Sequence, residues 1–253
     1  MQNPKSILIT GASSGIGRAL ALHYARAGVT LALNGRNRER LELVARECRA
    51  RGAKVIADVV DVTDEPALTA WIHAVDDKAP LDLVIANAGV SLGYRSGTPL
   101  GDHTGDTFAV NVWGVLHTIH AAIERMRARH RGRVAIMSSL AGFLGFPSAP
   151  AYSASKASVK AYGEALRGML APEGIAVNVI CPGFVESPMT DRNSFPMPFL
   201  MPAHRAARII ARGLERNKGR IAFPWPLVAV LRLVGLLPAS WLEWLLARLP
   251  AKV

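Results

Sequence analysis

Short apolar runs alternate along the chain with longer stretches in which apolar residues recur every three or four positions. The runs predict strands at residues 6–10, 29–34, 54–58, 81–86, 133–138 and 175–181, and the longer stretches predict helices at 18–28, 38–51, 65–76, 107–130 and 152–171. Strands that alternate with helices in this way are typical of a parallel sheet that helices cover on both faces. The sequence therefore predicts an α/β fold of three layers with a doubly wound parallel sheet.

Length and composition indicate a single domain with an added tail. A chain of 253 residues, half of them hydrophobic, fits one α/β domain, and no repeat or Gly/Ser-rich linker divides it. We assign residues 1–220 to this domain. Residues 221–253 are predicted to form an apolar C-terminal helical extension, in which no apolar run reaches the roughly 18 residues of a spanning helix.

Charge and cysteine content narrow the classes of function. The formal net charge is +11, but the basic cluster at residues 125–133 closes a predicted helix, where cations suit the helix dipole. No aromatic side chains interleave with this cluster, so we expect no nucleic-acid partner. Cys48 and Cys181 lack partners at metal-ligand spacing, and we expect no metal. The start of the chain has no long apolar run, which makes a cytoplasmic setting the default expectation.

A glycine-rich turn joins the first predicted strand to the first predicted helix. Gly11, Gly15 and Gly17 permit a tight turn and a close approach of the backbone to a ligand. The unpaired N–H groups at the start of the following helix suit a pyrophosphate. The alternative is a plain strand-to-helix turn without a ligand.

Tyr152 and Lys156 lie one turn apart on one face of a predicted helix. A cation beside a phenol lowers the pKa of the phenol toward neutral pH, so the pair could move a proton at a carbonyl or alcohol oxygen. An ordinary surface pair has the same spacing. Asn87, Ser139 and Pro182-Gly183 follow predicted strands, at the sheet edge where open α/β sheets bind ligands.

Together these residues resemble the short-chain dehydrogenase/reductase family in its single-domain form. The matching pieces are residues 10–17, Asp61 with Val62, Asn87-Ala88-Gly89, Asn111, Ser139, Tyr152 with Lys156, and Pro182-Gly183. The resemblance implies a Rossmann-type sheet, a nicotinamide cofactor and reversible hydride transfer at a carbonyl or secondary alcohol carbon. We also expect a homodimer or homotetramer.

The resemblance gives four residues catalytic roles. Tyr152 is expected to be the general acid for carbonyl reduction and the base for alcohol oxidation, with Lys156 depressing its pKa and holding the nicotinamide ribose. Ser139 is expected to hydrogen-bond the substrate oxygen, with Ser138 as the alternative. Asn111 is expected to anchor a water that relays protons to Lys156. A buried Asn111 bonded to local backbone is the other interpretation.

The expected cofactor-binding residues come from the glycine turn, from strand ends and from the helix that carries Tyr152. They are Gly11, Ser13, Ser14, Gly15, Ile16, Gly17, Arg36, Asp61, Val62, Asn87, Ala88, Gly89, Tyr152, Lys156, Pro182, Gly183, Val185 and Ser187. Asp61 is expected to accept from the adenine amino group, although a helix cap or turn residue would look the same. Ser187 stands where the family usually has a threonine that bonds the nicotinamide carboxamide.

The end of the second predicted strand favours NADP(H) over NAD. Enzymes that use NAD commonly have a carboxylate there, and this chain has Gly35 followed by Arg36. A guanidinium attracts a 2′-phosphate, so Arg36 is expected to select NADP(H), with Asn37 or Arg38 as helpers. The alternative is that Arg36 is a loop arginine that faces solvent.

The segment after Gly183 is expected to cover the substrate, as a lid over about residues 184–205. Its Met, Phe and Pro side chains suggest an apolar wall and a lipophilic substrate, although core packing would need the same residues. Ser91, Tyr94 and Ser148 are further polar candidates for the pocket. The predicted extension at 221–253 could contact a membrane surface, form a subunit interface or close the substrate mouth.

We therefore predict an NADP(H)-dependent oxidoreductase that acts on a carbonyl or secondary alcohol of an apolar substrate. The chain is expected to be cytoplasmic, with peripheral membrane contact through residues 221–253 kept as an open alternative. The rival hypothesis is a non-catalytic NADP-binding regulatory protein on the same fold.

Overall fold

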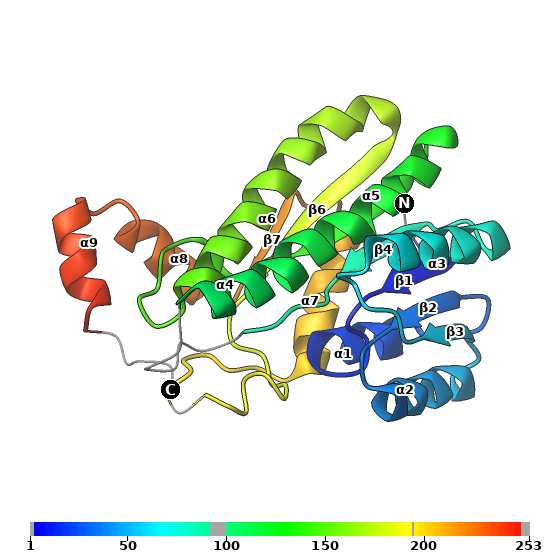
Figure 1. The fold of residues 1–253 in the computed structure, drawn as a ribbon, viewed down its shortest axis with the longest axis horizontal. Helices are drawn as coiled ribbons and strands as arrows, with labels where there is room; N and C mark the ends of the chain where they lie inside the picture. Colours follow the sequence, from blue (N-terminus) through cyan, green and yellow to red (C-terminus); the bar gives the residue numbers. More distant parts are fainter. Residues whose placement is uncertain (1–2, 92–99, 194, 249–253) are drawn as a thin grey trace.

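A seven-stranded parallel sheet forms the centre of the protein, in a computed structural model that describes residues 3–91, 100–193 and 195–248. The strand order is β3-β2-β1-β4-β5-β6-β7 (Figure 1). The strands are β1 (Ser6–Ile9), β2 (Thr30–Asn34), β3 (Lys54–Asp58), β4 (Leu83–Ala86), β5 (Gly132–Met137), β6 (Ile175–Pro182) and β7 (Arg220–Phe223). Strand β1 pairs with β2 on one side and with β4 on the other. The connection after β1 runs to β2, and the chain returns to the other side only at β4, so a crevice opens at the carboxyl ends of β1 and β4.

Helices cover both faces of the sheet, which confirms the predicted three-layer α/β fold. One face carries α1 (Gly15–Tyr24), α2 (Arg38–Ala50) and α7 (Ala203–Glu215), and the other carries α3 (Glu65–Lys78), α4 (Leu100–Phe108), α5 (Gly114–Ala128) and α6 (Pro150–Leu170). Each face has its own buried apolar cluster. The strands contribute to both clusters with alternate side chains, because successive residues of a strand point to opposite faces.

Three elements differ from the sequence prediction. The predicted helix 107–130 is already helical at Leu100, and a π-helical turn, η1 (Ala109–Trp113), interrupts it before α5. Helix α7 was not predicted, although its apolar positions at Ala206, Ile210 and Leu214 follow the helical period. Strand β7 was not predicted either, because it is four residues long and merges with the apolar segment that follows it.

The predicted boundary between residues 220 and 221 falls inside β7. This strand pairs with β6 from Arg220 to Phe223, so the first residues of the predicted extension belong to the sheet. The segment beyond the sheet begins at Pro224 and contains two helices, α8 (Trp225–Val234) and α9 (Ala239–Leu246). We call residues 224–248 the tail. Figure 1 shows α8 and α9 at one end of the molecule, with α9 standing away from the layered body.

Gly17 is required by packing, and we expect Gly17→Ala to lower the free energy of unfolding by about 1–3 kcal/mol. A Cβ at residue 17 would lie 2.2 Å from the Gly11 carbonyl oxygen and 2.6 Å from Nδ2 of Asn87. The first of these neighbours is backbone and cannot move aside without opening the turn. Urea denaturation of both proteins measures the difference.

Gly168→Ala is the matched control, because a Cβ at this exposed position in α6 would meet nothing within 4 Å. Alanine has the better helix propensity, so this variant should be as stable as the unmutated protein or more stable by about 0.5–1 kcal/mol. Equal effects of the two substitutions would contradict the assigned role of Gly17.

Candidate active site

A cavity of about 1010 Å³ lies along the carboxyl edge of the sheet, between the glycine turn and the tail. It gathers almost all of the predicted site residues. Only Gly17 and Asn111 of that set do not line it. Ser91 and Ser148 also line the cavity, whereas Tyr94 lies outside the described residues.

The glycine turn forms one wall of the cavity. Gly11 and Gly15 have φ values of +66° and +51°, in the left-handed region that favours glycine. Ser14 is the N-cap residue of α1, but its side chain makes no capping hydrogen bond, and the first turn of α1 has no acidic residue. Free N–H groups at the start of this helix suit an anion, so the turn fits a dinucleotide pyrophosphate.

Asn87 fixes the glycine turn to the sheet. Its Nδ2 donates to the carbonyl oxygens of Thr10 and Gly11, at 2.9 and 3.2 Å. Its backbone N–H donates to Oγ1 of Thr10, at 3.0 Å. These bonds join the ends of β1 and β4 beside the cavity.

Arg36 follows β2 and Asp61 follows β3, and both residues line the cavity. These strands lie on the side of the sheet away from β5, so this end of the cavity is the one remote from Tyr152. Oδ1 of Asp61 accepts hydrogen bonds from the N–H and the hydroxyl of Thr63, so Asp61 is a turn residue as well as a lining residue. The hydrogen bond from the backbone N–H of Thr63 is the main reason why the pKa of Asp61 is lowered, and the positive charge of Arg36 lowers it further. The helix cap of α3 is Asp64, not Asp61.

Two neighbours of Arg36 differ in their relation to the cavity. Arg38 does not line it, whereas Arg40, which the sequence analysis did not consider, does. Asn37 lines the cavity and also caps α2, because its side chain accepts from the backbone N–H of Arg40 at 2.8 Å. Arg40 lies in the first turn of α2, and the residue pattern alone does not separate it from Arg38.

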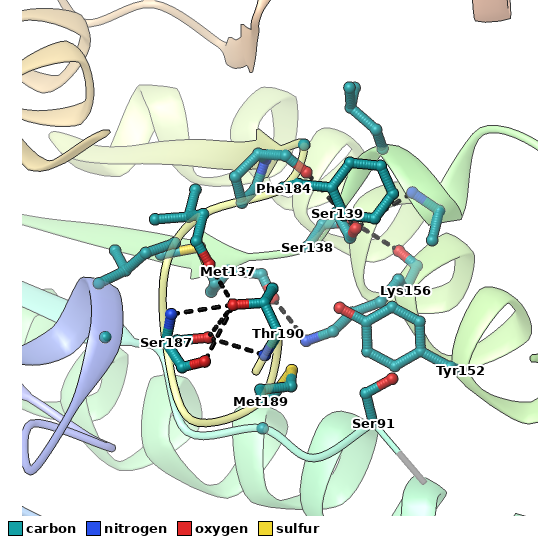
Figure 2. Close-up of a pocket in the computed structure, with 18 of the residues that line it drawn as sticks. Ser91, Met137, Ser138, Ser139, Tyr152, Lys156, Phe184, Ser187, Met189 and Thr190 are labelled. Atoms are coloured by element: carbon teal, nitrogen blue, oxygen red, sulfur yellow. Dashed lines mark hydrogen bonds between the residues drawn. The ribbon is translucent and has the colours of Figure 1, made fainter. Parts of the chain in front are cut away.

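Tyr152, Lys156 and Ser139 lie together in the middle of the cavity (Figure 2). Tyr152 and Lys156 both project from α6, and Nζ of Lys156 lies 5.7 Å from the centre of the Tyr152 ring. Nζ also donates to the carbonyl oxygen of Met137 at the end of β5, at 3.0 Å. Ser139 follows β5 and shares a hydrogen bond with the Tyr152 phenol.

Ser138 and Ser139 have different partners. The Ser138 hydroxyl donates to the carbonyl oxygen of Lys156 at 2.7 Å and so ties β5 to α6. The Ser139 hydroxyl accepts from the backbone N–H of Ala141 at 3.1 Å, and it faces the phenol. Of the two serines, Ser139 is the one positioned to share a ligand oxygen with Tyr152.

Burial shifts the pKa values of both members of the pair. Burial raises the pKa of Tyr152, and the opposing cause is the hydrogen bond with Ser139 rather than the charge of Lys156. Burial also lowers the pKa of Lys156 to about 8. Both groups lose hydration in the cavity, and this sets the direction of each pKa. The expected lowering of the Tyr152 pKa by Lys156 stays a prediction.

Asn111 is fully buried in the π-helical turn, behind the cavity wall. Its Oδ1 accepts from the backbone N–H of Val90, and its Nδ2 donates to the Val90 carbonyl and to Oγ of Ser155. The side chain thus joins the loop after β4 to α6. Asn111 is buried as the alternative expected, but its partners are not local backbone, because Val90 and Ser155 are 21 and 44 residues away. The water relay stays a prediction.

The segment between β6 and α7 forms the lid wall. Residues 203–205 of the predicted lid belong to α7. Hydrogen bonds between Phe184, Glu186 and Met201 close the base of the loop. Lid residues that line the cavity include Phe184, Met189, Phe195, Pro196 and Pro198, whereas Met201 packs in the core. Both sequence interpretations, cavity wall and core packing, therefore apply to different residues.

Ser187 lies beside the glycine turn, where a Cβ on Gly15 would be 3.0 Å from the Ser187 Cβ. Its backbone N–H donates to Oγ1 of Thr190 at 2.9 Å, and the two hydroxyls are 3.2 Å apart. Thr190 also lines the cavity and was missed by the sequence analysis. The lid therefore offers two hydroxyls at this position (Figure 2).

The tail supplies a cavity wall that sequence reasoning did not assign to particular residues. The lining residues are Leu227, Val230, Leu231 and Val234 of α8 and Leu245 and Leu246 of α9. With Leu144 and Phe146 after β5, they make the end of the cavity beyond Tyr152 apolar. The tail therefore closes this end of the cavity, and its three expected roles stay predictions.

Two further findings bear on the site and the tail. Among the residues that the structure describes, no cluster of three or more His, Cys, Asp or Glu side chains could hold a metal ion. None of the described helices combines the length and the apolar character needed to cross a bilayer.

Comparisons with known proteins agree with the fold. The sequence model of the family described as short chain dehydrogenase matches residues 5–196. A Myxococcus xanthus protein named "Uncharacterized oxidoreductase" is 40% identical over 235 residues, which cover 92% of this chain and 93% of that protein. "Uncharacterized oxidoreductase Rv0945" of Mycobacterium tuberculosis is 35% identical over 239 residues, with 92% and 94% covered.

Two solved structures extend the comparison. A short chain dehydrogenase/reductase of Burkholderia phymatum, in complex with NAD, has a TM-score of 0.84 and 25% identity, covering 99% of this chain and 98% of that one. A short-chain dehydrogenase of Sphingobium yanoikuyae, in complex with NADPH, has a TM-score of 0.79 and 25% identity, covering 93% and 97%. These matches, over nearly the whole chain, confirm the resemblance seen in the sequence: the protein belongs to the short-chain dehydrogenase/reductase family of oxidoreductases.

Proposed function

We propose that this protein is an NADP(H)-dependent oxidoreductase that interconverts a ketone and a secondary alcohol on a lipophilic substrate. One observation carries the proposal. Ser139, Tyr152 and Lys156 line the same cavity as the glycine turn and Arg36, so the proton-moving groups and a dinucleotide could meet in one space.

The cofactor supplies or accepts the hydride, and the residues of this chain handle the proton and the charge. Burial raises the pKa of Tyr152, so the phenol keeps its proton at neutral pH and can give it to a carbonyl oxygen as that oxygen gains charge. Ser139 donates a hydrogen bond to the same oxygen. Lys156 adds a positive charge beside both groups, and in alcohol oxidation Tyr152 takes the proton back.

The choice of NADP(H) is supported by residues of this chain, because the two structural relatives carry different cofactors. Arg36 and Arg40 line the end of the cavity remote from Tyr152. Gly35 stands at the end of β2, where NAD-dependent enzymes commonly have a carboxylate, whereas the nearby Asp61 follows β3. Two guanidinium groups favour a 2′-phosphate, which a carboxylate would repel.

A panel of ketones assayed with NADPH and with NADH tests the proposal directly. NADPH-dependent reduction, faster than with NADH, is the expected result. NADPH binding without turnover of any ketone or alcohol would favour the alternative, a non-catalytic NADP-binding regulatory protein. The assembly into a homodimer or homotetramer stays a prediction that native mass measurement would check.

The apolar end of the cavity predicts a dependence on substrate chain length. Each methylene that enters this end should raise kcat/KM by up to about fourfold, because burying one CH₂ contributes about 0.8 kcal/mol. A series of unbranched methyl ketones, each one methylene longer than the last, measures the slope. A flat series, or a preference for charged ketones, would contradict the proposed lipophilic substrate.

A further inference from the structure

We propose that the outer surface of the tail docks on an anionic lipid bilayer. We define this surface by the exposed large apolar side chains of the tail that do not line the cavity, namely Trp225, Leu233, Leu236, Trp241 and Trp244. Single exposed apolar residues are common on proteins, but five within twenty residues, three of them tryptophan, mark an interaction site.

The arrangement of α9 suits an interface between water and lipid. Trp241 and Trp244 are 66% and 61% exposed and lie one turn apart. The Arg248 guanidinium lies 3.6 Å from the centre of the Trp244 ring. Tryptophan favours the level of lipid headgroups, and an adjacent arginine can keep its charge at phosphate while its stem lies along apolar surface.

The charge of the tail and of the whole chain favours an anionic bilayer. From Trp225 to Arg248 the charged residues are Arg232, Glu243 and Arg248, and the chain as a whole has a formal net charge of +11. A protein with this excess of positive charge is attracted by anionic lipids. Since α8 and α9 have ten and eight residues, each is far shorter than the roughly 20 residues of a spanning helix, and the docking would be interfacial.

The same two helices form the inner wall of the cavity, where Val230 of α8 is a lining residue. A bilayer docked on the tail would therefore hold dissolved apolar molecules close to the apolar end of the cavity. This route for the substrate rests on the proposed function, whereas the docking itself does not.

Flotation of the full-length protein with lipid vesicles tests the docking. Unmutated protein should float with vesicles of phosphatidylcholine and phosphatidylglycerol, and less with phosphatidylcholine alone or at high salt. The double substitution Trp241→Ser and Trp244→Ser should weaken binding to the mixed vesicles by about tenfold or more, because it removes two large apolar side chains from the contact.

Trp113→Ser is the matched control, because Trp113 is 57% exposed but lies on η1, outside the tail. It should float as the unmutated protein does. Circular dichroism and native mass are measured for every variant. The proposal is overturned if unmutated protein does not float or if the double variant floats equally well. It is also overturned if the double variant changes the native mass instead, which would identify a subunit interface. None of these readouts uses turnover, so failure of the proposed reaction would show separately.

Discussion

Tyr152→Phe is expected to lower kcat by about 10²–10⁴-fold while leaving the KM for the dinucleotide within a few-fold of the unmutated value. The substitution removes the phenolic proton and keeps the ring in its place on α6. Without it, Ser139 can still hydrogen-bond the substrate oxygen, but the residue placed to give that oxygen a proton is lost. The loss should therefore fall on the chemical step and be seen in the rate of NADPH oxidation.

Tyr162→Phe provides a matched control on the same helix. The Tyr162 hydroxyl lies 2.7 Å from Nε2 of His120 and does not line the cavity. Its removal costs a partly exposed hydrogen bond, so turnover should stay close to that of the unmutated protein. If Tyr152→Phe kept more than about a tenth of the activity while folded, Tyr152 would not be the proton donor.

Arg36→Ala is expected to raise the KM for NADPH by about 10–100-fold and to change the KM for NADH little. A charge-assisted hydrogen bond to a phosphate contributes more than a neutral one, and NADH lacks that phosphate. The specificity of the enzyme should therefore shift toward NADH. Steady-state kinetics with both cofactors give the ratio, and direct NADPH binding gives the same answer without turnover.

Arg38→Ala separates a specific contact from a general loss of positive charge. Arg38 is an exposed arginine two residues from Arg36, and it does not line the cavity. Its removal should change the NADPH preference by less than about twofold, because an exposed charge outside the site is screened by solvent. Equal effects of the two substitutions would contradict a direct role for Arg36, as would a preference of the unmutated protein for NADH.

Most of the candidate site could be predicted because its residues have local signatures. The glycine turn is recognisable since Gly11 and Gly15 need a left-handed backbone, and that need appears directly as residue type. Tyr152 and Lys156 are one helical turn apart, and Ser139 directly follows the predicted strand 133–138. The parts that were missed lack such signatures: β7 is four residues long, and Thr190 is one hydroxyl in a loop.

The partners of Asn111 and the pKa direction of Tyr152 could not be predicted from the sequence. The type of Asn111 suggested a polar role in a helix, but its partners, Val90 and Ser155, are 21 and 44 residues away. The direction of the Tyr152 pKa likewise depends on burial, which is a property of everything packed around it. Spacing along a helix gives proximity, but not the hydration that sets a pKa.

By itself the sequence determined the alternation of strands and helices, the turn that suits a dinucleotide and the residues that can move a proton. Each of these depends on backbone preferences or side-chain chemistry within a short stretch of chain. Only the tertiary structure decided that α8 and α9 close the cavity with one side and expose tryptophan on the other. A helix rich in apolar residues has many faces that could be buried, and the choice among them depends on packing against residues distant in the sequence.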